Sequence, residues 1–223
     1  MKKIITKTIA AAGIAAGASA YATGASQGFY IGANIGSAWN QLWNKTEANE
    51  LAQSGSSGTD TVTSKSENAL AWGLFAGYNF ALAPNWLVGG QVGYSGLGSS
   101  TYHENDALLG HFDTKFSLSA VNILLTGTYS VQAGPGFFHV GPEIGAAIGM
   151  INPSQSSHFG GEDGNTQTKV LFVLGGTAGY QWNNIDMFLR YDHYFGSDFK
   201  VSSNIKDNFP SINAVFAGLA YTF

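Results

Sequence analysis

The chain has 223 residues, which one all-β domain can account for, and ten Lys and Arg against fourteen Asp and Glu give a formal net charge of −4. This mild acidity argues against nucleic acid as a partner, and the absence of cysteine excludes disulfides and thiolate metal sites. Hydrophobic residues make up 44% of the chain, yet after the N-terminal region they alternate with polar residues and with many of the 30 glycines. A transmembrane helix has about 18 or more consecutive apolar residues, and no later stretch approaches this length.

The N-terminal residues 1–20 have the composition of a secretory signal peptide. Lys2, Lys3 and Lys7 precede an uncharged run over residues 8–20 that is rich in Ala, Gly and Ile. This run is shorter than the about 20 apolar residues that a membrane-spanning helix needs, and it ends in two overlapping small-x-small sites. We therefore expect export of the chain, with cleavage after Ala20 or after Ala22.

Eight segments of the mature chain alternate bulky apolar residues with small or polar ones, which is the period-two pattern of an extended strand. In the first of them Phe29, Ile31 and Ile35 share one side, while Gly32 and Asn34 share the other. The predicted strands are residues 29–40, 68–80, 86–95, 114–131, 138–150, 168–182, 185–195 and 211–223.

The fourth predicted strand is the least regular of the eight. Phe116 and Leu118 fall out of phase with the apolar positions that begin at Val121. A β-bulge shifts the phase of a strand by inserting one extra residue. The sequence therefore predicts a bulge near Ser119 or Ala120.

The connections between predicted strands alternate between short and long. Tight turns occur at residues 134–136 and at Asn183-Asn184, where Asn tolerates a positive φ. The other connections have about 28, 18, 17 and 15 residues and are rich in Ser, Gly, Asn, Thr and acidic residues. An even strand count with short turns at one end and long loops at the other is typical of outer-membrane barrels, whose long loops are extracellular. We expect these loops to be solvated and mobile.

The two faces of the predicted strands differ in size, and this difference distinguishes a membrane barrel from a soluble, lipocalin-like one. One face carries the bulky apolar residues, whereas the other is mainly Gly, Ala, Asn, Gln and Thr. A core of glycine and charge cannot stabilise a soluble protein, so the bulky face must contact lipid. Aromatic residues that fit a periplasmic-side girdle cluster near the short turns: Tyr78, Phe80, Trp86, Tyr129, Phe138, Tyr180, Trp182 and Phe223.

The mature chain, residues 28–223, resembles the opacity-type surface antigens and the OmpA-like transmembrane domain. The resemblance rests on the opening GFYIG at 28–32, the stretch FLRYDHYFG at 188–196 and the ending LAYTF at 219–223. It implies an all-β, eight-stranded antiparallel transmembrane β-barrel in a Gram-negative outer membrane. It also implies that the barrel-assembly machinery reads the terminal residues Phe223, Tyr221, Leu219 and Val215, with Ala217 a weaker member.

Several charged side chains fall on the lumen face of the predicted barrel. Glu143, Arg190 and Asp192 are expected to pair there, with Lys169 nearer the extracellular mouth, because buried ions require partners. An eight-stranded barrel is just wide enough for side chains to fill, so we expect a plug more than a pore. Two interpretations of the pairs stay open: a gate whose ions exchange partners, and a static network that fixes strand register.

Two other groups of residues suggest chemistry. The stretch from Arg190 to His193 resembles the Arg-x-x-His of lipid A deacylase, but Phe195 stands where that family places its nucleophilic Ser, and Ser197 lies two positions further on. The second long loop contains imidazole and carboxylate ligands of the kind that bind zinc or nickel: His103, Glu104, Asp106, His111 and Asp113. Their spacing matches no fixed metal site, and solvated loop charges are the competing interpretation.

Together these patterns predict a monomeric, non-enzymatic surface barrel without a cofactor, with a structural or adhesin-like role carried by its extracellular loops. The expected partners are outer-membrane lipid, lipopolysaccharide bridged by divalent cations, the barrel-assembly machinery, and ligands on host or other cells. The alternatives are a narrow channel for small solutes and a lipid A-modifying hydrolase. Because no further domain follows Phe223, we expect no tethering to peptidoglycan. The ligand of the loops does not follow from the alternation.

Overall fold

The computed structural model describes residues 26–40, 61–65, 68–106, 110–157, 160–163, 166–202, 205–209 and 211–223. The predicted signal peptide lies outside these residues. Eight long strands form a barrel: β1 (Gly28–Asn40), β3 (Asn68–Ala83), β4 (Trp86–Asp106), β5 (Gly110–Ala133), β6 (Gly136–Ser157), β8 (Gln167–Trp182), β9 (Ile185–Phe195) and β12 (Ile212–Thr222). Four short strands accompany them: β2 (Thr61–Lys65), β7 (Gly160–Asp163), β10 (Ser197–Ser202) and β11 (Ile205–Phe209). Within the described part of the chain, no helix has the length and apolarity to cross a membrane.

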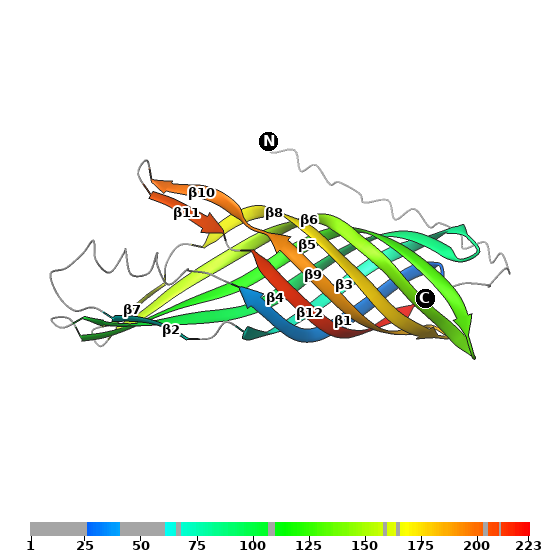
Figure 1. Cartoon of the computed structure of the whole chain (residues 1–223), viewed down its shortest axis with the longest axis horizontal. Coiled ribbons are helices and arrows are strands. Elements are labelled where there is room, and N and C mark those ends of the chain that lie inside the picture. The colour runs from blue at the N-terminus through cyan, green and yellow to red at the C-terminus, as the bar shows by residue number, and fades with distance from the viewer. Residues whose placement is uncertain are drawn as a thin grey trace, which may run out of the picture.

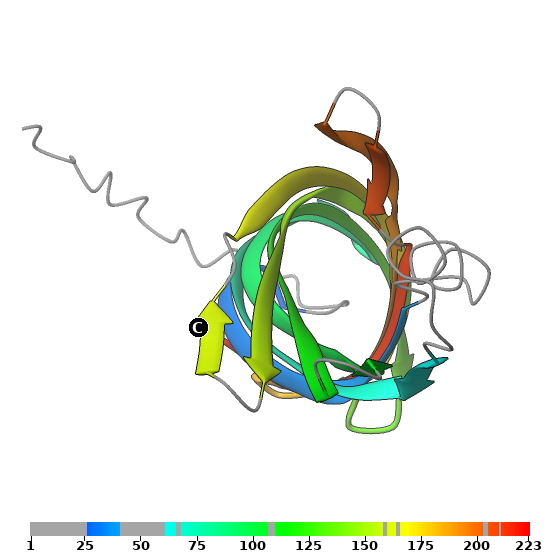
Figure 2. The same cartoon turned by 90° about the vertical axis from the view of Figure 1, so that its left-hand side faces the viewer.

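The eight long strands close into an antiparallel ring, as the sequence predicts (Figures 1 and 2). The last strand, β12, pairs with the first, β1, and β4 pairs with β5. Register partners can be followed once around the ring, through one residue of each strand: Ile185, Tyr221, Ile31, Ala76, Val92, Ile123, Ala146 and Phe172. Phe172 then pairs with Phe195, ten residues beyond Ile185 on the same strand. This stagger means that the strands tilt strongly against the barrel axis.

The alternating faces have the predicted orientation. Along β12, Val215, Leu219 and Tyr221 are exposed on the outside, whereas Phe216 and Thr222 are buried inside. The other barrel strands also expose bulky apolar residues on the outside, so the outer wall is apolar. The interior holds the buried polar side chains together with large apolar ones such as Phe75, Leu124 and Phe188. A bilayer is the solvent that such a wall requires.

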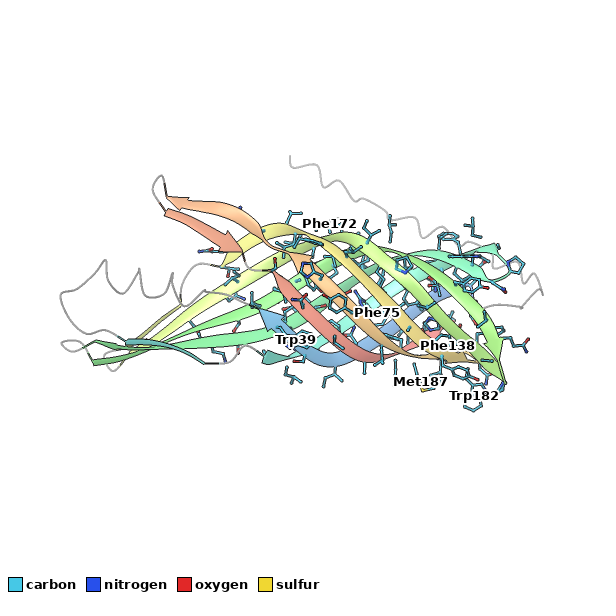
Figure 3. The ribbon with its side chains drawn as sticks, viewed as in Figure 1. Trp39, Phe75, Phe138, Phe172, Trp182 and Met187 are labelled. Atoms are coloured by element: carbon cyan, nitrogen blue, oxygen red, sulfur yellow. The ribbon has the colours of Figure 1, made fainter. Side chains whose placement is uncertain are left out.

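Exposed aromatic residues form two belts on the outer wall. The predicted belt near the short turns includes Trp182 and Phe138, and a second belt near the loop end includes Trp39 and Phe172 (Figure 3). Ten residues separate Trp182 from Phe172 on β8, which is about 33 Å along the strand. At a strand tilt of about 35–45° the two belts lie about 23–27 Å apart along the barrel axis. This separation matches the apolar band of about 25 Å that outer-membrane barrels present to lipid.

The prediction of a long second loop is wrong. Strand β4 continues to Asp106 and strand β5 begins at Gly110, so the wall of the barrel extends past its closed part (Figure 1). Strands β2 and β7 add to this extension, which has the order β2-β4-β5-β6-β7. The fourth connection also contains a hairpin, β10–β11. Residues 99–106 and 110–117 are mainly polar, so the period-two signal of apolar residues that marks the barrel strands is weak there.

The predicted bulge in the fourth strand is also wrong. β5 pairs with β6 without interruption through Leu118, Ser119 and Ala120, and the register shift lies on β4, between Gly96 and Ser99. There two residues of β4, Leu97 and Gly98, stand opposite Leu118 alone, and Gly98 has a φ of 88°. Leu118 therefore faces the lumen together with the other inward residues of β5, such as Ala120. It departs from the expected pattern because it is a large apolar residue that faces inward.

Candidate functional site

One guanidinium lies between two carboxylates inside the barrel. Arg190 and Asp192 belong to β9 and Glu143 to β6, which places all three on the lumen side of their strands. The Arg190 Nε is 3.0 Å from Glu143 Oε2 and 2.9 Å from Asp192 Oδ2. Their side chains are only 4%, 5% and 1% exposed for Arg190, Glu143 and Asp192 respectively.

The two contacts of Arg190 differ in kind. Arg190 Nε donates a hydrogen bond of 3.1 Å to Asp192 Oδ1. Glu143 Oε2 and Asp192 Oδ2 lie at ion-pair distance from the same nitrogen without the geometry of a hydrogen bond. The attraction between Glu143 and Arg190 is therefore mainly electrostatic, and Asp192 is the better-oriented partner.

Strand β8 brings the two carboxylates together. Gly175 of β8 is the register partner of both Glu143 on β6 and Asp192 on β9. A side chain at Gly175 would meet the Asp192 carboxylate, since an added Cβ would lie 2.5 Å from Oδ1. The absence of a side chain at Gly175 thus gives the acidic groups room on either side of β8.

The three-residue cluster has a formal charge of −1 when both carboxylates are ionised, because two carboxylates face one guanidinium. Removing one partner of a buried ion pair leaves an uncompensated charge and costs about 3–5 kcal/mol. The cluster is therefore sensitive to the loss of its single cation, and it links β6 and β9 across β8. The gate and the static network both remain compatible with this arrangement.

A cavity of about 70 Å³ lies below the cluster, at the short-turn end of the barrel. It is lined by residues of several strands, among them His139, Asp186, Glu143 and Arg190. His139 Nε2 is 2.7 Å from Asp186 Oδ1, and the Asp186 side chain is 24% exposed, so solvent reaches this level. The cavity is large enough to admit water, since about 10–15 Å³ suffices for one molecule.

Apolar side chains fill the barrel above the charged cluster, toward the loop end. Leu97, Leu118 and Ile151 are buried there, and Leu118 faces Ile151 across the β5–β6 pair. The buried cluster also contains Ala38, Ala71, Ala120, Leu124, Ala147, Leu171, Val173, Tyr194, Ile212, Ala214 and Phe216. Packing of these side chains leaves little room for water at this level of the lumen.

Lys169, the fourth predicted member of the lumen network, does not belong to the Arg190 cluster. It precedes Gly175 by six residues on β8, which is about 20 Å along the strand toward the loop end. This agrees with its expected position near the extracellular mouth and separates it from Glu143 and Asp192.

The His139–Asp186 contact and the apolar layer were not predicted. Both residues of the contact fall on the lumen phase near a short turn, a signal present in the sequence. Their pairing across β6, β8 and β9 depends on the register of the closed barrel, which the sequence pattern does not contain. The apolar layer was missed because the inward face was expected to carry small and polar residues. A large apolar residue on that face, such as Leu118, then looks like a break in the alternation.

The C-terminal residues that resemble an assembly signal lie on the outer wall. Val215, Leu219, Tyr221 and Phe223 are exposed, and the Phe223 ring packs edge-on against Tyr221 with centroids 5.2 Å apart. The backbone N–H of Phe223 donates a 2.8 Å hydrogen bond to the carbonyl of Phe29. The last residue therefore also helps to close β12 onto β1.

The proposed hydrolase motif is divided between two faces of β9. Arg190 lies inside the barrel, whereas His193 follows the outward phase, with its Nδ1 2.7 Å from Asn213 Oδ1. The Ser197 side chain lies outside the described residues. Within the described part, Arg190 and His193 therefore do not share a site.

The predicted metal ligands His103, Glu104, Asp106, His111 and Asp113 lie on β4 and β5, where the structure describes the backbone. Among the described side chains, no group of three or more His, Asp or Glu residues has the geometry to hold a metal ion. The backbone register pairs His103 with Asp113 and Asn105 with His111.

Solved structures similar to this chain are outer-membrane barrels of low sequence identity. The attachment invasion locus protein Ail of Yersinia pestis is 15% identical over 89% of this chain and 100% of its own, with a TM-score of 0.45. Neisserial surface protein A is 14% identical over 87% of this chain and 97% of its own, with a TM-score of 0.42. The outer membrane protease OmpT of Escherichia coli is 12% identical over 88% of this chain and 97% of its own, with a TM-score of 0.44. No curated protein matches the chain in sequence.

The family comparison covers nearly the whole mature chain. The model of the OmpA-like transmembrane domain matches residues 24–223, which include every strand of the barrel. An outer-membrane location agrees with the apolar outer wall and with the separation of its aromatic belts. The chain belongs to the OmpA-like transmembrane domain family, and it is a porin-like β-barrel of the Gram-negative outer membrane.

Proposed function

We propose that this protein is a non-enzymatic surface protein whose barrel anchors an extracellular β-sheet. The observation that carries the proposal is the division of the barrel along its axis. The lumen is filled by apolar side chains at the loop end, while the wall continues outward as the sheet β2-β4-β5-β6-β7. A filled barrel with a projecting sheet is suited to presenting a surface, and poorly suited to moving solutes.

The partners of this surface are part of the proposal. The outer wall contacts lipid, and the polar strands above the upper aromatic belt lie at the level of the lipopolysaccharide head groups and beyond. We propose structural or adhesive contacts of this sheet with lipopolysaccharide or with the surfaces of other cells. The barrel acts as a monomer, and the assembly machinery recognises its C-terminal strand through Phe223.

A deletion of the projecting hairpin tests the surface role. Residues 102–114 are replaced by Asn-Gly, which connects the register partners Thr101 of β4 and Lys115 of β5 by a two-residue turn. The variant should keep the migration of a folded barrel on SDS gels before boiling, and cells that express it should lose adherence to epithelial cells and to one another. Replacing residues 198–208 in the β10–β11 hairpin by the same turn is the matched control. Full adherence after removal of the β4–β5 extension from a folded barrel would contradict the proposal.

A narrow channel is the second candidate function, because the cavity at the short-turn end reaches the Glu143–Arg190 pair. Conduction would require ions to cross the apolar layer formed by residues such as Leu97, Leu171 and Ile212. We expect no conductance steps from the purified barrel in a planar bilayer. Steps that change in Glu143→Ala would favour a gated channel over the surface role.

The hydrolase alternative has no observation in its favour among the described residues. The imidazole of His193 and the guanidinium of Arg190 lie on opposite faces of the barrel wall. We expect mass spectra of lipid A from an overexpressing strain to show intact acyl chains. A loss of one acyl chain that depends on His193 would refute the non-enzymatic proposal.

A further inference from the structure

Two residues that precede β1 contact strands on both sides of it at the short-turn end of the barrel. Gln27 Oε1 accepts a 3.2 Å hydrogen bond from the backbone N–H of Ala81 on β3, the strand next to β1. The backbone N–H of Ser26 donates a 2.9 Å hydrogen bond to Gln181 Oε1 on β8. Ser26 and Gln27 are called the N-terminal strap below.

The position of Gln181 shows that the strap runs inward and not along the outer wall. In the ring of strands, β12 and β9 stand between β1 and β8. Gln181 is buried on the lumen side of β8, with 5% of the residue exposed. A chain that leaves β1 reaches this side chain by turning across the mouth of the barrel. Ser26 accordingly lines the lumen cavity, together with residues from the surrounding strands.

Gly28 supplies the turn between the strap and β1. Its φ is 142°, a backbone conformation that glycine adopts far more readily than residues with a side chain. An added Cβ would also lie 2.8 Å from the carbonyl oxygen of Phe223. At the next residue, the carbonyl of Phe29 accepts the hydrogen bond from Phe223, so β1 is fixed in the wall directly after the turn. The inward course of the strap therefore begins at a residue suited to it.

The strap lies beside the charged groups of the cavity. Gln181 is the register partner of Asp186, whose carboxylate contacts His139. The cavity that Ser26 lines also reaches the Glu143–Arg190 pair. The Asp186 side chain is 24% exposed, so the strap leaves this level open to water while it occupies part of the mouth.

We propose that the N-terminal strap is a stopper for the periplasmic mouth of the lumen, which admits water and keeps larger polar solutes out of the cavity. The short turns of an outer-membrane barrel face the periplasm, so this mouth is the periplasmic one. The strap is held by neutral hydrogen bonds of modest net strength, so it can open and close again. The stopper acts at the end opposite the apolar layer, and it goes beyond the proposed surface role without depending on it.

Labelling of a single cysteine tests the stopper, because the chain has no cysteine of its own. Thr128→Cys places a thiol in the wall of the cavity, and Gln132→Cys places one at an exposed position of β5 near the same mouth. The refolded mature barrel in detergent micelles is treated with a trimethylammonium methanethiosulfonate, and mass spectrometry gives the rate of thiol modification. Gel migration before and after boiling confirms that each variant is folded.

Ser26→Pro and Ser26→Ala are the matched pair that isolates the hydrogen bond to Gln181. The donor is a backbone N–H, which proline lacks and alanine keeps. With the original strap, Thr128→Cys should react more slowly than Gln132→Cys. Ser26→Pro should speed the reaction of Thr128→Cys about two- to tenfold, as the loss of one neutral hydrogen bond permits, and Ser26→Ala should leave it unchanged. A mature chain shortened to begin at Gly28 should react at least as fast as Ser26→Pro.

Equal rates for Thr128→Cys with the original strap and in the shortened chain would overturn the proposal. A Ser26→Pro variant that reacts no faster than Ser26→Ala would do so as well. A parallel rise for Gln132→Cys would also count against the stopper, because it would indicate a general loosening of this end of the barrel. These measurements do not involve adherence, so they leave the proposed function to its own test.

Discussion

Replacing Arg190 by Met should destabilise the barrel more than removing either of its acidic partners. Arg190 is the single cation of the cluster, and its loss leaves Glu143 and Asp192 buried, 5% and 1% exposed, without a counter-charge. Breaking a buried ion pair from one side costs about 3–5 kcal/mol. Glu143→Gln instead removes the excess negative charge and leaves the hydrogen-bonded Arg190–Asp192 pair intact, so we expect a cost of about 1 kcal/mol or less.

Urea unfolding in lipid vesicles, followed by tryptophan fluorescence, measures these costs. The triple variant Arg190→Met, Glu143→Gln and Asp192→Asn separates unpaired charge from lost packing, because it removes all three charges at similar volume. We expect it to recover much of the stability lost in Arg190→Met. A free energy of unfolding for Arg190→Met within about 1 kcal/mol of the wild type would refute the view that this cluster holds the barrel together. Equal losses in Arg190→Met and the triple variant would show that packing, and not charge, is responsible.

The geometry of the barrel wall gives three further predictions. Gly98→Ala should cost about 1–3 kcal/mol in the same urea assay, because φ is 88° at Gly98 and the new Cβ would collide with Ala69. The control Gly90→Ala, whose new Cβ would meet nothing within 4 Å, should be nearly neutral, and equal effects of the two variants would contradict the bulge. Leu189→Arg, between the aromatic belts, should cost about 2–4 kcal/mol, and Leu82→Arg at the short-turn end at most about 1 kcal/mol; the reverse order would misplace the membrane. Deleting Phe223, which is 69% exposed and bonded to Phe29, should reduce the heat-modifiable fraction in outer-membrane preparations, and an unchanged fraction would exclude its role in assembly.

The sequence alone determined the class of fold and the orientation of the wall. Which face of a strand a residue occupies is a local property, because side chains alternate along any extended backbone. Phe29, Ile31 and Leu219 could therefore be assigned to the lipid side, and Glu143, Arg190 and Asp192 to the lumen, without knowledge of any contact. The eight strands and the pairing of the last with the first followed from the same pattern and from the alternation of turns and loops.

The tertiary structure decided which residues meet. The distance from Arg190 to Glu143 depends on the order β6-β8-β9 and on the register of both pairs, and alternation carries no information on register between strands. Leu118 was read as the sign of a bulge, although it belongs to the buried cluster inside the barrel, because a local pattern cannot distinguish a bulge from a large residue that faces inward. Beyond the closed part of the barrel the sequence of β4 and β5 is mainly polar and alternates weakly, so the ladder that pairs His103 with Asp113 is visible only in the folded sheet.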